Sequence, residues 1–244
     1  MKATRRSRPL VIANFAITAD GKISTRNRTP SLFTSPRDKR NLLRIRAGVD
    51  AILVGRGTVA SDAMTMGLPD DSFRAQRIAR GQAEFPLRVV VTNSGRLSSK
   101  LRLFQARAGP LVIFSADQMS RATESRLQAL GAEIRRQRGR AVNLGKMLAE
   151  LRADHAVKTV VCEGGAALMR SLLEAELVDR IHLTLCPVIF GGKRAPTLTG
   201  LPGAFLPRAI KLKMIAMDVS TEGECFLEYR VVRPRGWEKI MSDD

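Results

Sequence analysis

Glu163 is a carboxylate that stands directly before a pair of glycines, Gly164 and Gly165. The residues before it, 157–161, are mostly β-branched and predict a buried strand, and apolar residues at helical spacing follow the glycines. A helix that begins at a double glycine exposes unpaired N–H groups, and these donors and the helix dipole both favour phosphate. The sequence therefore predicts an anion site with a carboxylate beside it. Two plainer alternatives stay open: the glycines only ease a turn, or Glu163 caps its own helix.

Polar residues also follow three other predicted strands, at 9–17, 49–55 and 87–91. The loops after these strands read Asp20-Gly21, Gly55-Arg56-Gly57-Thr58 and Thr92-Asn93-Ser94. In open parallel sheets, ligands bind beyond the carboxyl ends of the strands. We therefore expect all four loops to border one binding site. Thr58 as a simple helix cap, and 92–96 as a plain turn, are the alternatives.

Strands and helices alternate from the N-terminus to about residue 178, and three strands then follow one another. Alternation indicates a parallel sheet with helices on both faces, and the final strands indicate an antiparallel extension at one edge. We therefore predict an α/β fold in a single domain that spans residues 1–235, followed by a polar tail at 236–244. The remaining expected strands are 110–114, 132–135, 180–188, 210–218 and 224–232, and the expected helices are 35–48, 72–79, 120–130 and 143–154.

The residues around Ser35 predict how the first helix begins and ends. Ser35 suits the N-cap, Pro36 the first helical position, and Asp38 completes a capping box with Ser35. Gly48 suits a left-handed exit from the helix. Most of the basic residues on this helix are expected to face solvent, but Arg46, close to the loop that follows, is placed to do more.

The formal net charge of +18 over 244 residues is the one extreme feature of the composition. It raises affinity for polyanions in general, including nucleic acid, phosphorylated metabolites and anionic lipid. Aromatic residues make up only 5% of the chain and the arginines are dispersed, which disfavours nucleic acid as the main partner. No run of 18 apolar residues is present and no signal peptide is recognisable, so we expect no membrane association.

The three cysteines and two histidines show no metal-ligand spacing. An odd cysteine count without C-x-x-C disfavours a zinc site and a disulfide scaffold. We therefore expect no metal, and a location in the reducing cytoplasm.

Five motifs along nearly the whole chain point to a known family. They are A-x-T-x-D-G-K at 16–22, T-S-P at 34–36, R-A-G-V-D-A-I-L-V-G-x-G-T-V at 46–59, E-G-G-A-x-L at 163–168 and C-P-V-I-F-G-G at 186–192. In these motifs the sequence resembles the reductase domain of bifunctional riboflavin-biosynthesis proteins. The resemblance implies the dihydrofolate-reductase-like fold, a three-layer α/β/α arrangement. The zinc motifs of the fused deaminase half are not found in these residues, so we expect a free-standing reductase.

The resemblance implies an NADPH-dependent reduction of the ring-opened ribosylamino group of a pyrimidine ribose phosphate to a ribitylamino group, with hydride delivered to ribose C1′. It implies that Arg46 and Glu163 bind the substrate and that Glu163, Lys22 and Asp20 form the catalytic centre. It also implies that the helix start at 165–171 contacts the cofactor. With the residues that end the third strand added, the cofactor contacts expected by name are Ala16, Thr34, Gly55, Gly57, Thr58, Asp62, Asn93, Ser94, Arg96, Gly164, Gly165, Ala166, Ala167 and Leu168.

The sequence departs from the family in the segment 61–69. Family members carry D-D/N-P-x-L-T-x-R there, and its last arginine grips the substrate. This chain keeps Asp62 but reads Ala63-Met64-Thr65-Met66-Gly67 afterwards, so the arginine is missing. A related NADPH reductase acting on another pterin, pyrimidine or carbonyl substrate is therefore the second hypothesis, and a basic nucleic-acid-binding protein on the same fold is the third.

Two further expectations concern the cofactor and the assembly. NADPH should be preferred to NADH, because Asn93, Ser94 and Arg96 end a strand where an adenosine 2′-phosphate fits and no acidic residue is present in that turn. We also expect a homodimer, because the strands at 210–232 end the sheet with an apolar edge, which soluble proteins usually cover. The resembled family pairs in the same way.

Overall fold

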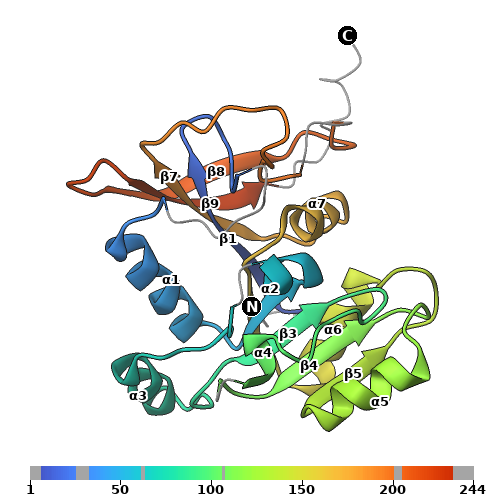
Figure 1. The fold of residues 1–244 in the computed structure, drawn as a ribbon. Helices are drawn as coiled ribbons and strands as arrows, with labels where there is room; N and C mark the ends of the chain where they lie inside the picture. The colour runs from blue at the N-terminus through green and yellow to red at the C-terminus, as the bar shows by residue number, and fades with distance from the viewer. Residues whose placement is uncertain (1–6, 26–32, 62–63, 106–107, 201–204, 233–244) are drawn as a thin grey trace, which may run out of the picture.

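The computed structural model describes residues 7–25, 33–61, 64–105, 108–200 and 205–232, which form one nine-stranded sheet with helices on both faces (Figure 1). The predicted Asp62 and the polar tail at 236–244 lie outside the described residues. The strand order is β5-β4-β3-β2-β6-β1-β7-β9-β8. The strands are β1 (Leu10–Thr18), β2 (Ala51–Gly55), β3 (Leu87–Val91), β4 (Leu111–Ser115), β5 (Ala132–Arg136), β6 (Thr159–Cys162), β7 (Arg180–Cys186), β8 (Lys211–Val219) and β9 (Cys225–Val232).

The strands from β5 to β7 are parallel, whereas β9 runs antiparallel to both β7 and β8. The predicted fold, a mostly parallel sheet with an antiparallel extension at one edge, is confirmed. The helices are α1 (Pro36–Gly48), α2 (Arg56–Ser61), α3 (Asp71–Ala79), α4 (Arg102–Gln105), α5 (Arg121–Ala129), α6 (Leu144–Asp154) and α7 (Ala166–Glu174). Among them, none is long and apolar enough to cross a membrane.

The core lies in two layers, one on each face of the sheet. Residues of α6 and α7, among them Leu148 and Leu172, pack with Val11 and Leu53 on one face. Residues of α1, α2, α4 and α5 pack on the other face against alternate residues of the same strands. The alternation follows from the two-residue period of side chains along a strand. This arrangement is the expected three-layer one.

The start of α1 differs from the predicted capping box. The Ser35 hydroxyl accepts a hydrogen bond from the amide of Asp38 at 3.1 Å, as expected. The Ser35 amide, however, donates to Glu224 Oε1 at 2.7 Å, and the carboxylate of Asp38 accepts from Thr184 Oγ1 instead. The predicted bond from the Ser35 amide to Asp38 is therefore wrong. Glu224, which directly precedes β9, accepts that hydrogen bond instead.

The end of α1 also differs from the prediction, since Gly48 is the last helical residue and does not adopt a left-handed conformation. Two arginines of α3 bind the carbonyl groups that such an exit would satisfy. Arg77, which is fully buried, donates to the carbonyls of Ala47 and Val49, and Arg80 donates to that of Ala47 at 2.6 Å. Cations stabilise the negative end of a helix dipole, so the two arginines take over the role of the predicted glycine cap.

Two boundaries near the predicted site also shift. The strand expected at 157–161 spans Thr159–Cys162 and so runs directly to Glu163. The expected glycine loop after β2 is absent, because α2 begins at Arg56 immediately after the strand. Thr58 is therefore inside a helix rather than its cap, and the cap alternative is wrong.

Candidate active site

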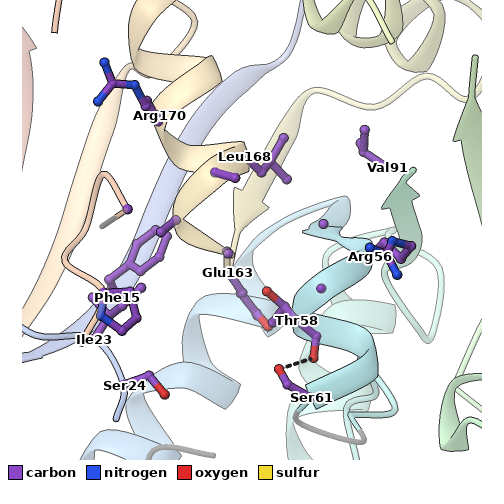
Figure 2. Close-up of a pocket in the computed structure, with 18 of the residues that line it drawn as sticks. Phe15, Ile23, Ser24, Arg56, Thr58, Ser61, Val91, Glu163, Leu168 and Arg170 are labelled. Atoms are coloured by element: carbon purple, nitrogen blue, oxygen red, sulfur yellow. Dashed lines mark hydrogen bonds between the residues drawn. The ribbon is translucent and has the colours of Figure 1, made fainter. Parts of the chain in front are cut away.

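A large cavity of about 1140 Å³ lies beyond the carboxyl ends of β1, β2, β3 and β6. Three of the four predicted loops contribute to its wall, namely those after β2, β3 and β6. The predicted site residues that line it are Ala16, Thr34, Arg46, Gly55, Gly57, Thr58, Asn93, Ser94, Glu163, Gly164, Gly165, Ala166, Ala167 and Leu168. Figure 2 shows Glu163 and Thr58 between Phe15, Ile23 and Ser24 on one side and Arg56 and Val91 on the other.

Two backbone segments of the cavity wall are in direct contact where the ends of β2 and β6 meet. The Gly55 amide donates to the Gly164 carbonyl at 2.7 Å, and the Glu163 amide donates to Leu53 at 3.0 Å. Gly164 has a φ of 111°, a backbone conformation that residues other than glycine rarely adopt. A Cβ atom added at Gly165 would stand 2.9 Å from Thr58 Oγ1. The glycine pair therefore lets the start of α7 approach α2, which a plain turn would not require.

The amino end of α7 opens into the cavity without a side chain covering it. Its N-cap is Gly165, which makes no side-chain capping bond, so Glu163 does not cap this helix and that alternative is wrong. Ala166, Ala167 and Leu168, the first helical residues, all line the cavity. Free N–H groups and the positive end of the helix dipole therefore face the space where a ligand would lie.

Glu163 and Arg46 form a buried ion pair in the wall of the cavity. Arg46 Nε donates to Oε1 of Glu163 at 2.7 Å and Nη2 donates to Oε2 at 2.6 Å, while Nη1 donates to the carbonyl of Gly67 at 2.8 Å. Their side chains are only 9% and 6% exposed. Burial lowers the pKa of the Arg46 guanidinium, but the facing carboxylate outweighs this effect and leaves that pKa raised. The two residues predicted to bind the substrate thus bind each other.

Three other predicted residues do not line the cavity: Asp20, Lys22 and Arg96. The carboxylate of Asp20 accepts hydrogen bonds from the Thr18 hydroxyl and from the amides of Phe190 and Gly191. The Thr18 bond is the main cause that lowers the pKa of Asp20 to about 2. Lys22 pairs with Thr197 in an isolated β-bridge. Asp20 therefore stabilises the backbone at residues 190–191 rather than facing the cavity.

Three lining residues with charged side chains were not among the predicted site residues, namely Asp38, Lys39 and Arg56, whereas Arg170 lies within the predicted helix start at 165–171. The sequence did not indicate Asp38 as a site residue, because its capping-box spacing already explained its presence. Arg56 stands between two glycines, and the pattern of that loop predicted a role for the glycines and Thr58 only. Arg170 donates to Glu174 at 2.7 Å and to the carbonyl of Phe205 at 3.0 Å. In the part of the chain that the structure describes, no group of three or more potential ligands is arranged to hold a metal.

The architecture is that of the dihydrofolate-reductase-like α/β proteins, with a ligand-sized cavity at the carboxyl edge of the sheet. The chain belongs to the family described as the RibD C-terminal domain, whose model matches residues 9–224.

Individual relatives agree with this assignment. The chain is 33% identical over 193 residues to the 2,5-diamino-6-ribosylamino-4(3H)-pyrimidinone 5′-phosphate reductase of Archaeoglobus fulgidus, covering 78% of this chain and 86% of that protein. It is 29% identical over 230 residues to the riboflavin biosynthesis protein RibD of Actinobacillus pleuropneumoniae, covering 93% of this chain but 58% of that protein. A pyrimidine reductase-like protein from Corynebacterium diphtheriae has the same fold, with a TM-score of 0.75 at 21% identity and 93% coverage of both chains.

The contact between Gly165 and Thr58 gives a test of the cavity wall. Gly165→Ala should lower the free energy of unfolding by about 1–3 kcal/mol, because its methyl group meets Thr58 Oγ1 and no other atom within 4 Å. Thr58→Ala removes that oxygen, so the double variant should recover part of the loss. Urea unfolding of the wild type, both single variants and the double variant gives the coupling energy. Strict additivity of the two losses would contradict the close approach.

Proposed function

We propose that the chain is an NADPH-dependent reductase of riboflavin biosynthesis. Its substrate would be a pyrimidine ribose phosphate, either 5-amino-6-(5-phosphoribosylamino)uracil or its 2,5-diamino-pyrimidinone precursor, whose ribosylamino group is reduced to ribitylamino. The observation that carries the proposal is the uncapped start of α7 opening into the cavity directly beside the Arg46–Glu163 pair. Relatives named as reductases of the 2,5-diamino compound support the choice of substrate.

The residues around the start of α7 fit the diphosphate of a nicotinamide dinucleotide. The exposed amides of Gly165 to Ala167 offer donors, and the glycines at 55 and 57 leave the neighbouring wall without side chains. When bound, the nicotinamide supplies hydride to ribose C1′. The chain's own part is to orient the two molecules within one enclosed cavity, so that the reacting atoms meet.

The adenosine end of the cofactor would lie toward the carboxyl end of β3. Asn93 and Ser94 line the cavity there, as expected, and Arg56 lines the same cavity at the start of α2. Among the described residues Arg56 forms no hydrogen bond or ion pair, and it is exposed. We therefore assign recognition of the 2′-phosphate to Arg56 with Ser94, while the role predicted for Arg96 stays a prediction.

The substrate would lie over Glu163 and Arg46, with the ribose hydroxyls on the carboxylate. In the ligand-free arrangement Glu163 has both oxygens occupied by Arg46, and each carboxylate oxygen has a further lone pair for a hydroxyl donor. Arg46 in turn fixes the carboxylate, because its planar fork matches both oxygens. The Glu163 carboxylate would therefore be a rigidly held acceptor for the ribose hydroxyls. The contribution of the pair to catalysis would be to position the substrate.

Replacing Glu163 tests this role. Glu163→Gln should lower kcat/KM by tenfold or more, about 1.4 kcal/mol, because the charge that orders the ribose is lost. It should also lower the free energy of unfolding by several kcal/mol, since Arg46 is left buried without its partner. Kinetics with NADPH and the pyrimidine ribose phosphate, together with urea unfolding, measure the two effects.

A double variant separates binding from stability. Arg46→Gln combined with Glu163→Gln removes both buried charges and should regain most of the lost stability, while kcat/KM stays low. The exposed pair of Glu176 and Arg208, exchanged for glutamines in the same way, is the control and should change neither quantity. Full recovery of activity in the Arg46 and Glu163 double variant would reduce the pair to a structural role.

Cofactor preference tests the assignment of Arg56. The wild type should prefer NADPH to NADH, and Arg56→Gln should lower that preference by tenfold or more by removing a charge-assisted bond to the 2′-phosphate. Arg96→Gln is the matched control, since Arg96 does not line the cavity, and it should change the preference less. Ratios of kcat/KM for the two cofactors decide between them. The reverse ranking of the two variants would return this role to Arg96.

A reductase of another substrate is the second candidate, because the segment that carries the substrate arginine in the family is apolar here. Met64 lines the cavity, and Met66 and Leu68 are fully buried in the core. A panel of phosphorylated and unphosphorylated pyrimidine, pterin and carbonyl compounds, assayed for NADPH oxidation, distinguishes the two candidates. Turnover of a panel member at a higher kcat/KM than either riboflavin precursor would favour the second.

We infer that the protein forms a homodimer in a reducing cytoplasm. The edge strand β8 is exposed along its whole length, and its apolar side chains include Met214 at 48%, Met217 at 62% and Val219 at 53% exposure. An unpaired edge with apolar side chains is a surface that proteins usually cover. The three cysteines are all unpaired, which agrees with a reducing compartment.

The assembly is measured by sedimentation. The wild type should sediment as a dimer at micromolar concentration, and the double change Met214→Glu with Met217→Glu on β8 should give a monomer. Ile78→Glu, at an equally exposed apolar residue on α3, is the control and should leave the dimer intact. A wild-type monomer of 26.8 kDa would contradict the assignment.

A further inference from the structure

The reduction that the proposed function describes consumes a proton as well as hydride, so one group must release a proton to the substrate. Among the described residues, the titratable side chains that line the cavity are those of Asp38, Lys39, Arg46, Arg56, Glu163 and Arg170. Neither histidine is among them, and the buried Cys162 and Cys186 do not line it either. Glu163 is committed to Arg46 through both of its oxygens. Of the two carboxyl groups among these described residues, Asp38 is therefore the one that forms no ion pair.

Asp38 lines the cavity and is held there by two threonine hydroxyls. Its Oδ1 accepts a hydrogen bond from Thr184 Oγ1 at 2.6 Å, and the Thr34 hydroxyl also binds its carboxyl group. Thr184 on β7 pairs across the sheet with Ala16 on β1, which lines the cavity. Asp38, Leu42 and Arg46 recur every four residues, so they share the cavity-facing side of α1.

Capping of α1 does not require the carboxyl group of Asp38. The hydroxyl of Ser35 caps the first turn, and Glu224 accepts from the amide of Ser35 in the place that a capping box would give to Asp38. A carboxyl group that is released from capping, partly buried and open to the cavity is free to act on a ligand.

The surroundings favour the protonated form of Asp38. Burial is the main cause that raises the pKa of its carboxyl group, and the charge of Glu224 adds to it. The hydroxyls of Thr184 and Thr34 and the ammonium group of Lys39 lower that pKa, but do not outweigh the burial. Glu224 is itself only 3% exposed and binds Ser35 and the Cys186 thiol rather than a cation. Those are the charged and titratable groups that face Asp38 from α1, β7 and the start of β9.

We propose that Asp38 is the catalytic acid that donates the proton to the substrate nitrogen. In the ring-opened substrate, C1′ gains hydride from the nicotinamide cofactor, which is oxidised, and the electron pair of the C1′–N π bond moves to nitrogen. The O–H bond of Asp38 breaks as the N–H bond forms, and Asp38 is left as a carboxylate that takes a proton back from solvent. The step consumes one NADPH and one proton for each amine formed.

Replacing Asp38 tests the assignment, which rests on the proposed function. Asp38→Asn should lower kcat/KM at pH 7 by about a hundredfold, as loss of a general acid does. In the wild type, kcat/KM should fall as the pH rises through the pKa of Asp38, and the variant should lose this dependence. The variant should fold: because the native pKa is raised, ionisation of Asp38 costs stability as pH rises above the unfolded value, and asparagine avoids that cost.

Two neighbouring variants should move the pKa of Asp38 in opposite directions. Glu224→Gln removes a charge that raises it, so the decline in kcat/KM should shift to lower pH. Thr184→Val removes a hydrogen bond that lowers it, so the decline should shift to higher pH. Infrared titration of the protonated carboxyl band in the protein without ligands gives the same pKa independently of turnover, and the band should be absent from Asp38→Asn.

The outcomes separate this proposal from the proposed function. A wild type that does not reduce either riboflavin precursor contradicts the function itself. An active wild type with an Asp38→Asn variant of unchanged kcat/KM and pH profile overturns only the role of Asp38. A carboxyl band of Asp38 that titrates no higher than that of an ordinary aspartic acid also overturns it, whereas opposite shifts in the two neighbouring variants support it.

Discussion

The close contact between the ends of β2 and β6 is the constraint on which the site depends. The hydrogen bond from Gly55 to Gly164 joins the two strand ends, and Thr58 leaves room for no side chain at Gly165. Because the backbone is this close, the start of α7 faces the cavity with its amides uncovered. The same contact brings Glu163 within reach of Arg46, which projects from α1. The uncovered helix start and the buried carboxylate of Glu163 therefore come from one local arrangement.

Helix α1 connects this arrangement to the antiparallel end of the sheet. Its first turn is bound to Glu224 near β9 and to Thr184 on β7, while its last carbonyls are bound by the buried Arg77 of α3. The helix is thus fixed at both ends by side chains distant in sequence. Since Asp38 and Arg46 both project from its cavity-facing side, the position of α1 determines where both side chains stand in the cavity.

Much of the architecture was predictable because it follows local rules. The β-branched runs and the helix spacing place the strands and most of the helices, and the four polar strand ends point to the edge where the cavity lies. The pairing of Glu163 with Arg46 was not predictable, because the two residues are 117 positions apart and each had been assigned to the ligand separately. Neither Gly48 nor the capping box behaved as local rules suggest, since Arg77 and Glu224 reach these helix ends from other elements. Asp38 illustrates the consequence: its local explanation concealed its place in the cavity.

Tracing the transferred hydrogen tests the central claim most directly. The protein would be incubated with NADPH carrying deuterium at both C4 positions and with the 2,5-diamino-pyrimidinone ribose phosphate, and the product analysed by mass spectrometry and NMR. The account predicts a ribitylamino product with one deuterium, located at C1′, in amounts that match the cofactor oxidised. Cofactor oxidation without deuterium in the product, or deuterium on the pyrimidine ring, would contradict it.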